Sequence, residues 1–350
     1  MNPSGRAARG RGTAPRDHGG RPVSRDRCGI LYRGGPTAPS GWEASTDLAD
    51  VVETHLERSK RLASTPWEEA GPRGGFIGGT VASVREIAGR RELLSLLTRR
   101  ELKSRYKDSA LGFLWSLARP LTQLLIYYLV VGQFLGAARS IQNFAIYIFA
   151  GLAIYTLFQE TVAGATSSIV SNSGLVKKVY FPREILPLAA TGSAIFNFLV
   201  QFVILLVAAG LVGTLAFGVH LLYGLASFVI ILIYAVAVGL ILGGLNVYLR
   251  DVQYIVEVVL MLLLWASPIL YSWPQATAVM PDWLAQIYLG NPITLCVIAF
   301  QEAFWSPGSD GVMLDMLPLR LVIAGAVGVV LLFVGQRWFS RLQGDFAQEL

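Results

Sequence analysis

The sequence predicts an all-α polytopic membrane protein with six transmembrane helices, and three observations carry this prediction. Hydrophobic residues make up 53% of the 350 residues and charged residues only 15%, whereas soluble domains carry about 25% charged residues. The charges are segregated, because 33 of the 52 lie in residues 1–110, 4 in residues 337–350 and 15 in the 226 residues between. Apolar segments of span length recur through that middle region. A soluble core of this size is excluded, since single cores stop growing near about 250–300 residues.

Composition divides the chain into four regions. Residues 1–83 are predicted to be a disordered basic extension and linker, because residues 1–40 are rich in Gly, Pro, Ser and Arg and have no apolar period. No apolar core follows the early arginines, so a signal peptide is not expected. Residues 84–110 are predicted to hold an interface helix, residues 111–337 the membrane domain, and residues 338–350 a cytoplasmic tail.

The predicted interface helix is amphipathic and lies on the inner membrane surface. Residues 84–107 carry eight basic and three acidic side chains. Four apolar side chains share one arc of the helix: Ile87, Leu93, Leu94 and Leu97. Such helices are typical of segments that bind anionic lipid headgroups. A solvated linker helix is the alternative.

Six segments of the middle region are candidates for transmembrane helices, because crossing the hydrocarbon needs about 20 mostly apolar residues. They are residues 115–137, 144–166, 188–213, 219–245, 254–272 and 318–337. A seventh apolar stretch, residues 284–305, is interrupted at Asn291 and Pro292. Proline removes a backbone donor and disfavours helix just before itself. This stretch is therefore predicted to be a re-entrant helical hairpin that enters from outside.

The distribution of Lys and Arg orients the predicted spans, because cytoplasmic loops collect basic residues. Residues 272–317 contain no Lys or Arg. Basic residues follow the second, fourth and sixth spans: Lys177, Lys178, Arg183, Arg250, Arg337 and Arg341. Both termini are therefore predicted to be cytoplasmic.

The sequence lacks the motifs of nucleotide hydrolysis and of metal catalysis. No Gly-Lys pair occurs, so a Walker A loop is absent. Two distant cysteines, Cys28 and Cys296, and three histidines give no metal-ligand spacing. The chain is expected to be a transport subunit with no catalytic residue, no metal, no cofactor of its own and no nucleic-acid partner.

Side chains inside the spans are candidates for a substrate path. Glu160 is ionisable and lies in the second span, where such groups are functional candidates; hydrogen bonding between helices is the alternative. Asn197 and Gln201 lie one turn apart, which is typical of helix–helix contacts. Aromatic faces can stack on sugar rings, with packing against lipid as the alternative. The path candidates are Tyr127, Tyr155, Phe158, Glu160, Trp265 and Tyr271.

The loop after the second span, residues 171–184, is predicted to form a short helix on the cytoplasmic surface. A break at Gly174 is followed by two lysines and two aromatic residues. Such a helix would present Val179, Tyr180 and Phe181 to a partner protein. A basic anchor with an interfacial aromatic pair fits the same residues equally well.

Several stretches of the sequence resemble the ABC-2-type permeases that export polysaccharides and polyol-phosphate polymers. The resemblance covers about residues 84–345 in the family's order and leaves residues 1–83 outside. It is carried by residues 100–120 (RELKSRYKDSALGFLWSLARP), 175–187 (LVKKVYFPREILP), 245–252 (LNVYLRDV), 267–271 (SPILY) and the pair Asn291-Pro292.

The resemblance implies the membrane subunit of an O-antigen, teichoic-acid or galactan exporter in the bacterial cytoplasmic membrane. In this family a homodimer carries two separate ATP-binding cassette subunits, which bind ATP and Mg. The substrate is a glycan or polyol-phosphate polymer on polyprenyl diphosphate. The matching loop docks into the ATPase, which implies the coupling residues Leu175, Lys177, Lys178, Val179, Tyr180, Phe181, Pro182, Arg183 and Glu184. The interface helix is expected to attract the diphosphate or lipid headgroups through Arg99, Arg100, Lys103 and Arg105.

Three other functions stay open at this point. An ABC-2 permease that exports a drug or small lipid has the same six spans. A polytopic membrane glycosyltransferase or acyltransferase needs paired carboxylates or a histidine near the surface, and the outer acidic residues are not paired at catalytic spacing: Asp282, Glu302, Asp310 and Asp315. A secondary transporter predicts an internal repeat and buried ion ligands, and the sequence offers neither.

Overall fold

The computed structural model describes residues 76–106, 114–179, 181–215, 218–305 and 313–350, together with Glu57, Lys60 and Ser64. The chain divides into two units, residues 1–68 and 69–350. Every secondary-structure element among the described residues is a helix, and all the helices named below belong to the second unit.

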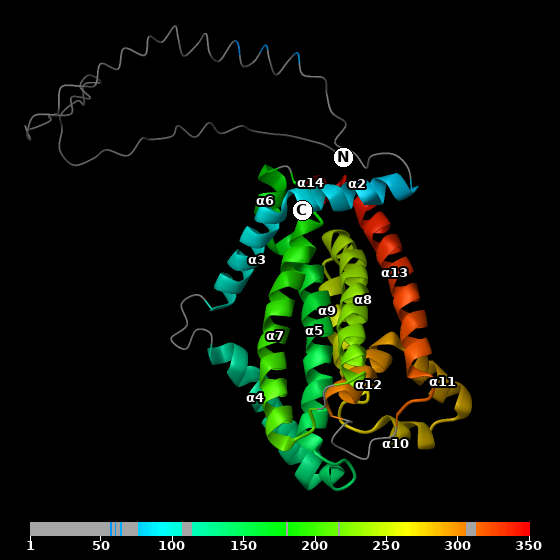
Figure 1. The fold of residues 1–350 in the computed structure, drawn as a ribbon. Coiled ribbons are helices and arrows are strands. Elements are labelled where there is room, and N and C mark those ends of the chain that lie inside the picture. Colours follow the sequence, from blue (N-terminus) through cyan, green and yellow to red (C-terminus); the bar gives the residue numbers. More distant parts are fainter. Residues whose placement is uncertain are drawn as a thin grey trace, which may run out of the picture. The chain divides into compact units, whose positions relative to one another are not determined.

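Four of the described helices are long and apolar enough to cross a membrane. They are α5 (Phe144–Ser171), α7 (Ile185–Val212), α8 (His220–Tyr248) and α13 (Leu317–Leu342). Helix α8 is central, because it packs against α5, α13 and α12 (Pro292–Phe304), while α5 also packs against α7. Figure 1 shows these helices running along one another as a bundle. Their positions match the predicted second, third, fourth and sixth spans.

The first and fifth predicted spans differ from the structure. The first span was predicted as one helix over residues 115–137. The structure has the α-helix α4 (Leu114–Tyr127), which continues as a seven-residue π-helix, η1 (Tyr128–Phe134). In place of a helix over 254–272, α9 (Val252–Trp265) has 14 residues, about 21 Å at the α-helical rise. That length is less than the roughly 30 Å of hydrocarbon in a bilayer. The described residues thus contain four candidate spans, or five with a bent pair of helices.

The bent pair consists of α11 (Asp282–Gly290) and α12, which meet at 73°. The break lies at Asn291, as the sequence predicts. The Asn291 side chain accepts a hydrogen bond from the Ile293 amide at 3.0 Å and so caps α12, while Pro292 occupies a first position that needs no donor. Helix α12 is buried from Ile293 to Phe304, and such burial is what permits irregular backbone within a membrane protein.

Two N-terminal helices replace the single predicted one. Helix α2 (Phe76–Gly89) begins before residue 84, so the predicted start is wrong, and Arg90 separates it from α3 (Arg91–Tyr106). The four side chains of the predicted arc are divided between the two helices, with Ile87 on α2 and the three leucines on α3. All four of these side chains pack against a cluster of buried residues that includes Val176, Ile185 and Phe339.

The ends of the bundle differ in the helices they carry. Helices α2, α6 (Ser173–Lys178) and α14 (Phe346–Glu349) lie at one end, which we call the basic end. Helices α10 (Trp273–Ala278) and α11 lie at the opposite end (Figure 1). At the basic end α14 packs against α6, and α2 packs against α13.

Helices α5 and α8 approach so closely that only glycine fits at two positions of α8. A Cβ on Gly239 would lie 2.6 Å from the Ala165 Cβ, and a Cβ on Gly243 would lie 2.8 Å from the Ala165 carbonyl oxygen. Small residues of this kind allow the backbones of membrane helices to make close contact. We call this contact the α5–α8 seam.

We expect Gly243→Leu to lower the stability of the protein, because the obstructing atom is backbone and cannot rotate away. Overpacking of this kind typically costs about 1–3 kcal/mol. The thermal transition of the purified chain in detergent, followed by fluorescence, measures the effect. Gly210→Leu on α7 is the matched control, because a Cβ there meets nothing within 4 Å. Equal midpoints for the two variants would contradict the close contact.

Candidate functional site

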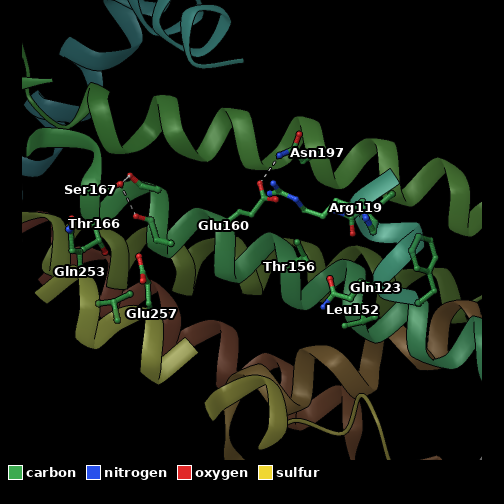
Figure 2. A pocket seen from close by; sticks show the side chains of 16 residues that line it. Arg119, Gln123, Leu152, Thr156, Glu160, Thr166, Ser167, Asn197, Gln253 and Glu257 are labelled. Carbon is green, nitrogen blue, oxygen red and sulfur yellow. Dashed lines mark hydrogen bonds between the residues drawn. The ribbon is translucent and has the colours of Figure 1, made fainter. Parts of the chain in front are cut away.

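A polar cavity of about 690 Å³ lies between α4, α5, α7 and α9. Figure 2 shows its lining side chains from close by. A volume of this size is typical of ligand-binding pockets. The lining is polar although it is built on apolar helices, and its polar members are Arg119, Gln123, Thr156, Glu160, Thr166, Ser167, Asn197, Gln201, Gln253 and Glu257.

Glu160 lies in the cavity wall where α4, α5 and α7 meet. Its Oε2 accepts a hydrogen bond from Asn197 Nδ2 at 2.6 Å, which joins α5 to α7. In Figure 2 the Arg119 side chain reaches from α4 toward the same carboxylate. Glu160 therefore bonds another helix and also lines the cavity, and Asn197 does both as well.

Helix α9 supplies a second acidic group. Gln253 and Glu257 extend from α9 toward the side of α5 that carries Thr166 and Ser167 (Figure 2). The Thr166 hydroxyl donates to the Val162 carbonyl at 2.7 Å, and Ser167 likewise bonds to carbonyls of its own helix. These hydroxyl oxygens keep lone pairs that can accept a hydrogen bond from a ligand. The cavity thus offers carboxylate, amide and hydroxyl groups in one space.

Glu160 is the only predicted path residue that lines this cavity. Tyr155 and Phe158 are buried inside the chain, and the Tyr155 hydroxyl donates to the Leu260 carbonyl of α9. Trp265 is largely exposed, and its carbonyl accepts a hydrogen bond from the Tyr271 hydroxyl at 2.9 Å. Tyr127 packs against the hydrophobic core. Aromatic content alone therefore did not identify the lining.

The sequence analysis missed Arg119, Gln123, Gln253 and Glu257. A signal for two of them was present, because Arg119 and Glu257 are ionisable and fall inside predicted spans. Such residues are functional candidates by default. The amides of Gln123 and Gln253 carry no comparable signal, since only the rotation of α4 and α9 brings them to the cavity.

A smaller cavity of about 130 Å³ adjoins the large one, and Gly164 and Ser167 line both. It lies between α3 and α5, where Arg100 Nη2 donates to Asn172 Oδ1 at 3.0 Å. Glu101 also lines it. One arginine of the predicted headgroup set therefore reaches α5.

The other predicted headgroup residues lie along α3. Arg99 and Lys103 are exposed. The side chain of Arg105 lies outside the described residues. Among the predicted headgroup residues whose side chains the structure describes, only Arg100 lines a cavity.

The coupling loop has an exposed part and a buried part. Lys177, Lys178 and Val179 are exposed, while Leu175 packs against the buried cluster at the basic end. Tyr180 lies outside the described residues. Phe181 is only 5% exposed, so the prediction that it faces a partner is wrong: its ring is taken up by the protein's own core.

The end of the coupling loop is also turned inward. Glu184 is buried, and Pro182 is half-buried. The Arg183 guanidinium donates to the Gln343 carbonyl and lies 5.7 Å from the centre of the Phe346 ring, a favourable cation–π distance. The surface that the described loop offers to a partner therefore reduces to α6 and Val179.

The described residues contain no group of three or more His, Cys, Asp or Glu side chains that could hold a metal ion. The chemistry available in the large cavity is hydrogen bonding and charge. That is chemistry for accommodating a polar ligand between helices.

Comparison with known proteins places this arrangement in a family. Residues 92–305 match the ABC-2 type transporter family. The chain is 31% identical over 271 residues to an O-antigen export system permease protein of Myxococcus xanthus, across 76% of this chain and 98% of that relative. It is also 27% and 26% identical to two O-antigen export system permease proteins of Klebsiella pneumoniae, across 74% of this chain and 95% of each relative.

The family match begins in α3 and ends just after α12, so it contains the large cavity, the coupling loop and the bent pair. With its apolar helices, this match identifies a multi-pass protein of the bacterial inner membrane. The chain belongs to the ABC-2 type transporter family.

Proposed function

We propose that this chain is the membrane subunit of an ATP-driven exporter that moves a polysaccharide or polyol-phosphate polymer, carried on polyprenyl diphosphate, across the inner membrane. The polar cavity carries the proposal. Lipid hydrocarbon excludes sugar hydroxyl groups, whereas the amides and carboxylates of Asn197, Gln201 and Glu160 can bond to them. The relatives named as O-antigen export permeases support a glycan substrate.

The proposed topology has six crossings with both termini in the cytoplasm. The basic end faces the cytoplasm, because Lys177, Lys178 and Arg250 lie there. Helix α4 with η1 makes the first crossing, and α9 with the segment that follows it makes the fifth. The bent pair then enters from the exterior without crossing.

A second copy of the chain completes the proposed conduit. Helices α4 and α9 border the cavity, and each also exposes apolar side chains, among them Leu125, Ile255 and Met261. A large exposed apolar surface needs either lipid or a partner to cover it. We place the partner copy against α4 and α9, so that the two cavities face one another.

The motor of the proposed exporter is a pair of ATP-binding cassette subunits, which hold ATP and Mg. They dock at α6, where Lys177 and Lys178 are exposed. Since α6 leads into α7, a displacement of α6 shifts the wall of the cavity that α7 forms. The diphosphate of the carrier lipid is attracted by the basic face of α3, and Arg100 lies beside the small cavity that adjoins the large one.

The test is reconstitution of the chain with its ATP-binding partner in proteoliposomes, followed by ATP-dependent movement of a lipid-linked glycan. We expect Gln201→Leu to reduce export about tenfold, since one lost hydrogen bond with an unpaired partner costs roughly 1.4 kcal/mol. Val203→Leu on the exposed side of α7 is the control and keeps wild-type export. Stimulation of ATP hydrolysis by a drug or small lipid, and not by glycan, would instead assign the small-molecule branch of the fold.

A further inference from the structure

The carboxylate of Glu184 joins three segments that lie far apart in the sequence. It precedes the first turn of α7 and is only 3% exposed. Its Oε2 accepts a hydrogen bond from Ser83 Oγ of α2 at 2.6 Å. Its Oε1 accepts from Gln336 Nε2 at 3.1 Å and from Ser340 Oγ at 3.0 Å, both on α13. One buried side chain thus connects α2, α7 and α13 at the basic end.

Helix α2 is attached to α13 a second time. Thr80 Oγ1 donates to Gln336 Oε1 at 2.8 Å, and Thr80 and Ser83 share a face of α2 because they are three residues apart. Helix α13 is in turn fixed on α8, since a Cβ on Gly335 would lie 2.8 Å from the Ala237 carbonyl oxygen. The network therefore ties α2 to α13, and α13 packs on α8.

Holding helices together with a buried carboxylate has a high cost in free energy. Desolvation of the charge is costly, and apolar residues of similar volume often stabilise a protein as well or better. The donors that we identify on Ser83, Gln336 and Ser340 are neutral. Three hydrogen bonds to one carboxylate fix the position of Glu184 relative to Ser83 on α2 and to Gln336 and Ser340 on α13. The arrangement therefore favours a role in positioning over a role in stability alone.

The position of Glu184 connects this network to the surface that a partner can reach. Lys177 and Lys178 face outward on α6, whereas Phe181 is buried and Arg183 bonds to the end of α13. The loop from α6 to Glu184 thus has an outer end that is free to be pushed and an inner end that is bonded to two other helices.

We propose that Glu184 is a positioning residue that transmits displacement of α6 to α2 and to the end of α13, in place of a direct contact with the ATPase. This inference rests on the proposed function, in which α6 is the docking element. A push on α6 then moves the N-terminal helices together with α7. Without the carboxylate, α6 and α7 would still move, but the hydrogen bonds that join Glu184 to α2 and α13 would be lost.

The experiment uses the full chain with its ATP-binding partner in proteoliposomes and compares Glu184→Gln with wild type. The amide keeps the size of the side chain but places an NH₂ group opposite one of the present donors. We expect glycan export per ATP hydrolysed to fall about fivefold or more, while ATP hydrolysis stays within about twofold. The matched control is Glu349→Gln, an exposed carboxylate on α14 at the same end, which leaves both rates unchanged.

A double-mutant cycle separates positioning from folding. Ser83→Ala removes one donor, and alone it is expected to lower the glycan export per ATP hydrolysed. In the Glu184→Gln background it is expected to cause little further loss, since the effects of contacting residues are not additive. A parallel loss of export and ATP hydrolysis would overturn the proposal, because it would indicate that Glu184 supports docking of the ATP-binding partner. An unchanged ratio would overturn it as well. If Glu184→Gln does not assemble, Ser83→Ala and Thr80→Ala decide by the same criterion.

Hydrogen exchange tests the network without any glycan. In the assembled complex, the amides of residues 76–89 are expected to exchange faster in Glu184→Gln than in wild type, while those at the α5–α8 seam stay unchanged. Equal exchange in α2 would refute the link between α2 and Glu184. Failure of the wild-type complex to export glycan, with the exchange result intact, would count against the proposed substrate and not against the network.

Discussion

Ala163→Trp is expected to stop export while the complex continues to hydrolyse ATP. Ala163 lines the large cavity from α5, so an indole at this position would occupy the space that a sugar chain needs. The proposed docking surface on α6 is untouched, and the proposed partner subunits are therefore expected to hydrolyse ATP as before. We expect export to fall at least about 100-fold, since the indole would prevent passage through the cavity and no binding contact could compensate for that.

Export of lipid-linked glycan and release of phosphate, measured on the same proteoliposomes, check this prediction. The matched control is Ala326→Trp on α13, where the side chain is exposed and lies outside the cavity. Wild-type export by Ala163→Trp would mean that the substrate passes elsewhere. Loss of both rates would mean that the indole distorts the packing of α5.

Reversal of both charges on α6, in the variant Lys177→Glu with Lys178→Glu, is expected to abolish association with the ATP-binding partner. These lysines are exposed and precede Val179, which is exposed as well. Replacing two favourable contacts by like-charge contacts costs several kcal/mol, so we expect affinity to fall by about 100-fold or more. Co-purification of the two subunits, repeated at rising salt, measures the change.

Arg139→Glu is the control for charge reversal, because Arg139 is exposed and lies before α5 at the end of the bundle away from α6. It should leave association unchanged. Wild-type association of the double variant would remove α6 from the docking surface. Recovery of binding at higher salt would support an electrostatic contact, because screening weakens the new repulsion.

The long helices of the fold were predictable, because hydropathy and length decide whether a segment can span a membrane. The break at Asn291 was also predictable, since proline and its neighbour act locally. The short length of α9 was not predictable. The sequence stays largely apolar after Trp265, but the helix ends there. The start of α2 at Phe76 was missed for the opposite reason: its glycines signal a loop, and tertiary contacts with α13 outweigh that signal.

The candidate site was predictable in its chemistry but not in its membership. Glu160 was found because an ionisable group in a span is rare. The hydrogen-bond partner of Glu160 comes from α7 and neighbouring lining residues come from α4, and no pattern within one helix reveals which residues another helix brings near. Phe181 and Glu184 were placed in the docking surface for a related reason. The resemblance to the family predicts that they belong to a coupling loop, but only the packing of the folded chain shows that both are buried.

The α5–α8 seam decides where the cavity can widen. Gly239 and Gly243 pack directly against Ala165, so these two helices are in close contact and are expected to move together. Helix α9 buries only Val256 and Leu260 in this chain. A passage wide enough for the proposed polymer is therefore expected to open by movement of the other walls, α4, α7 and α9, relative to α5 and α8.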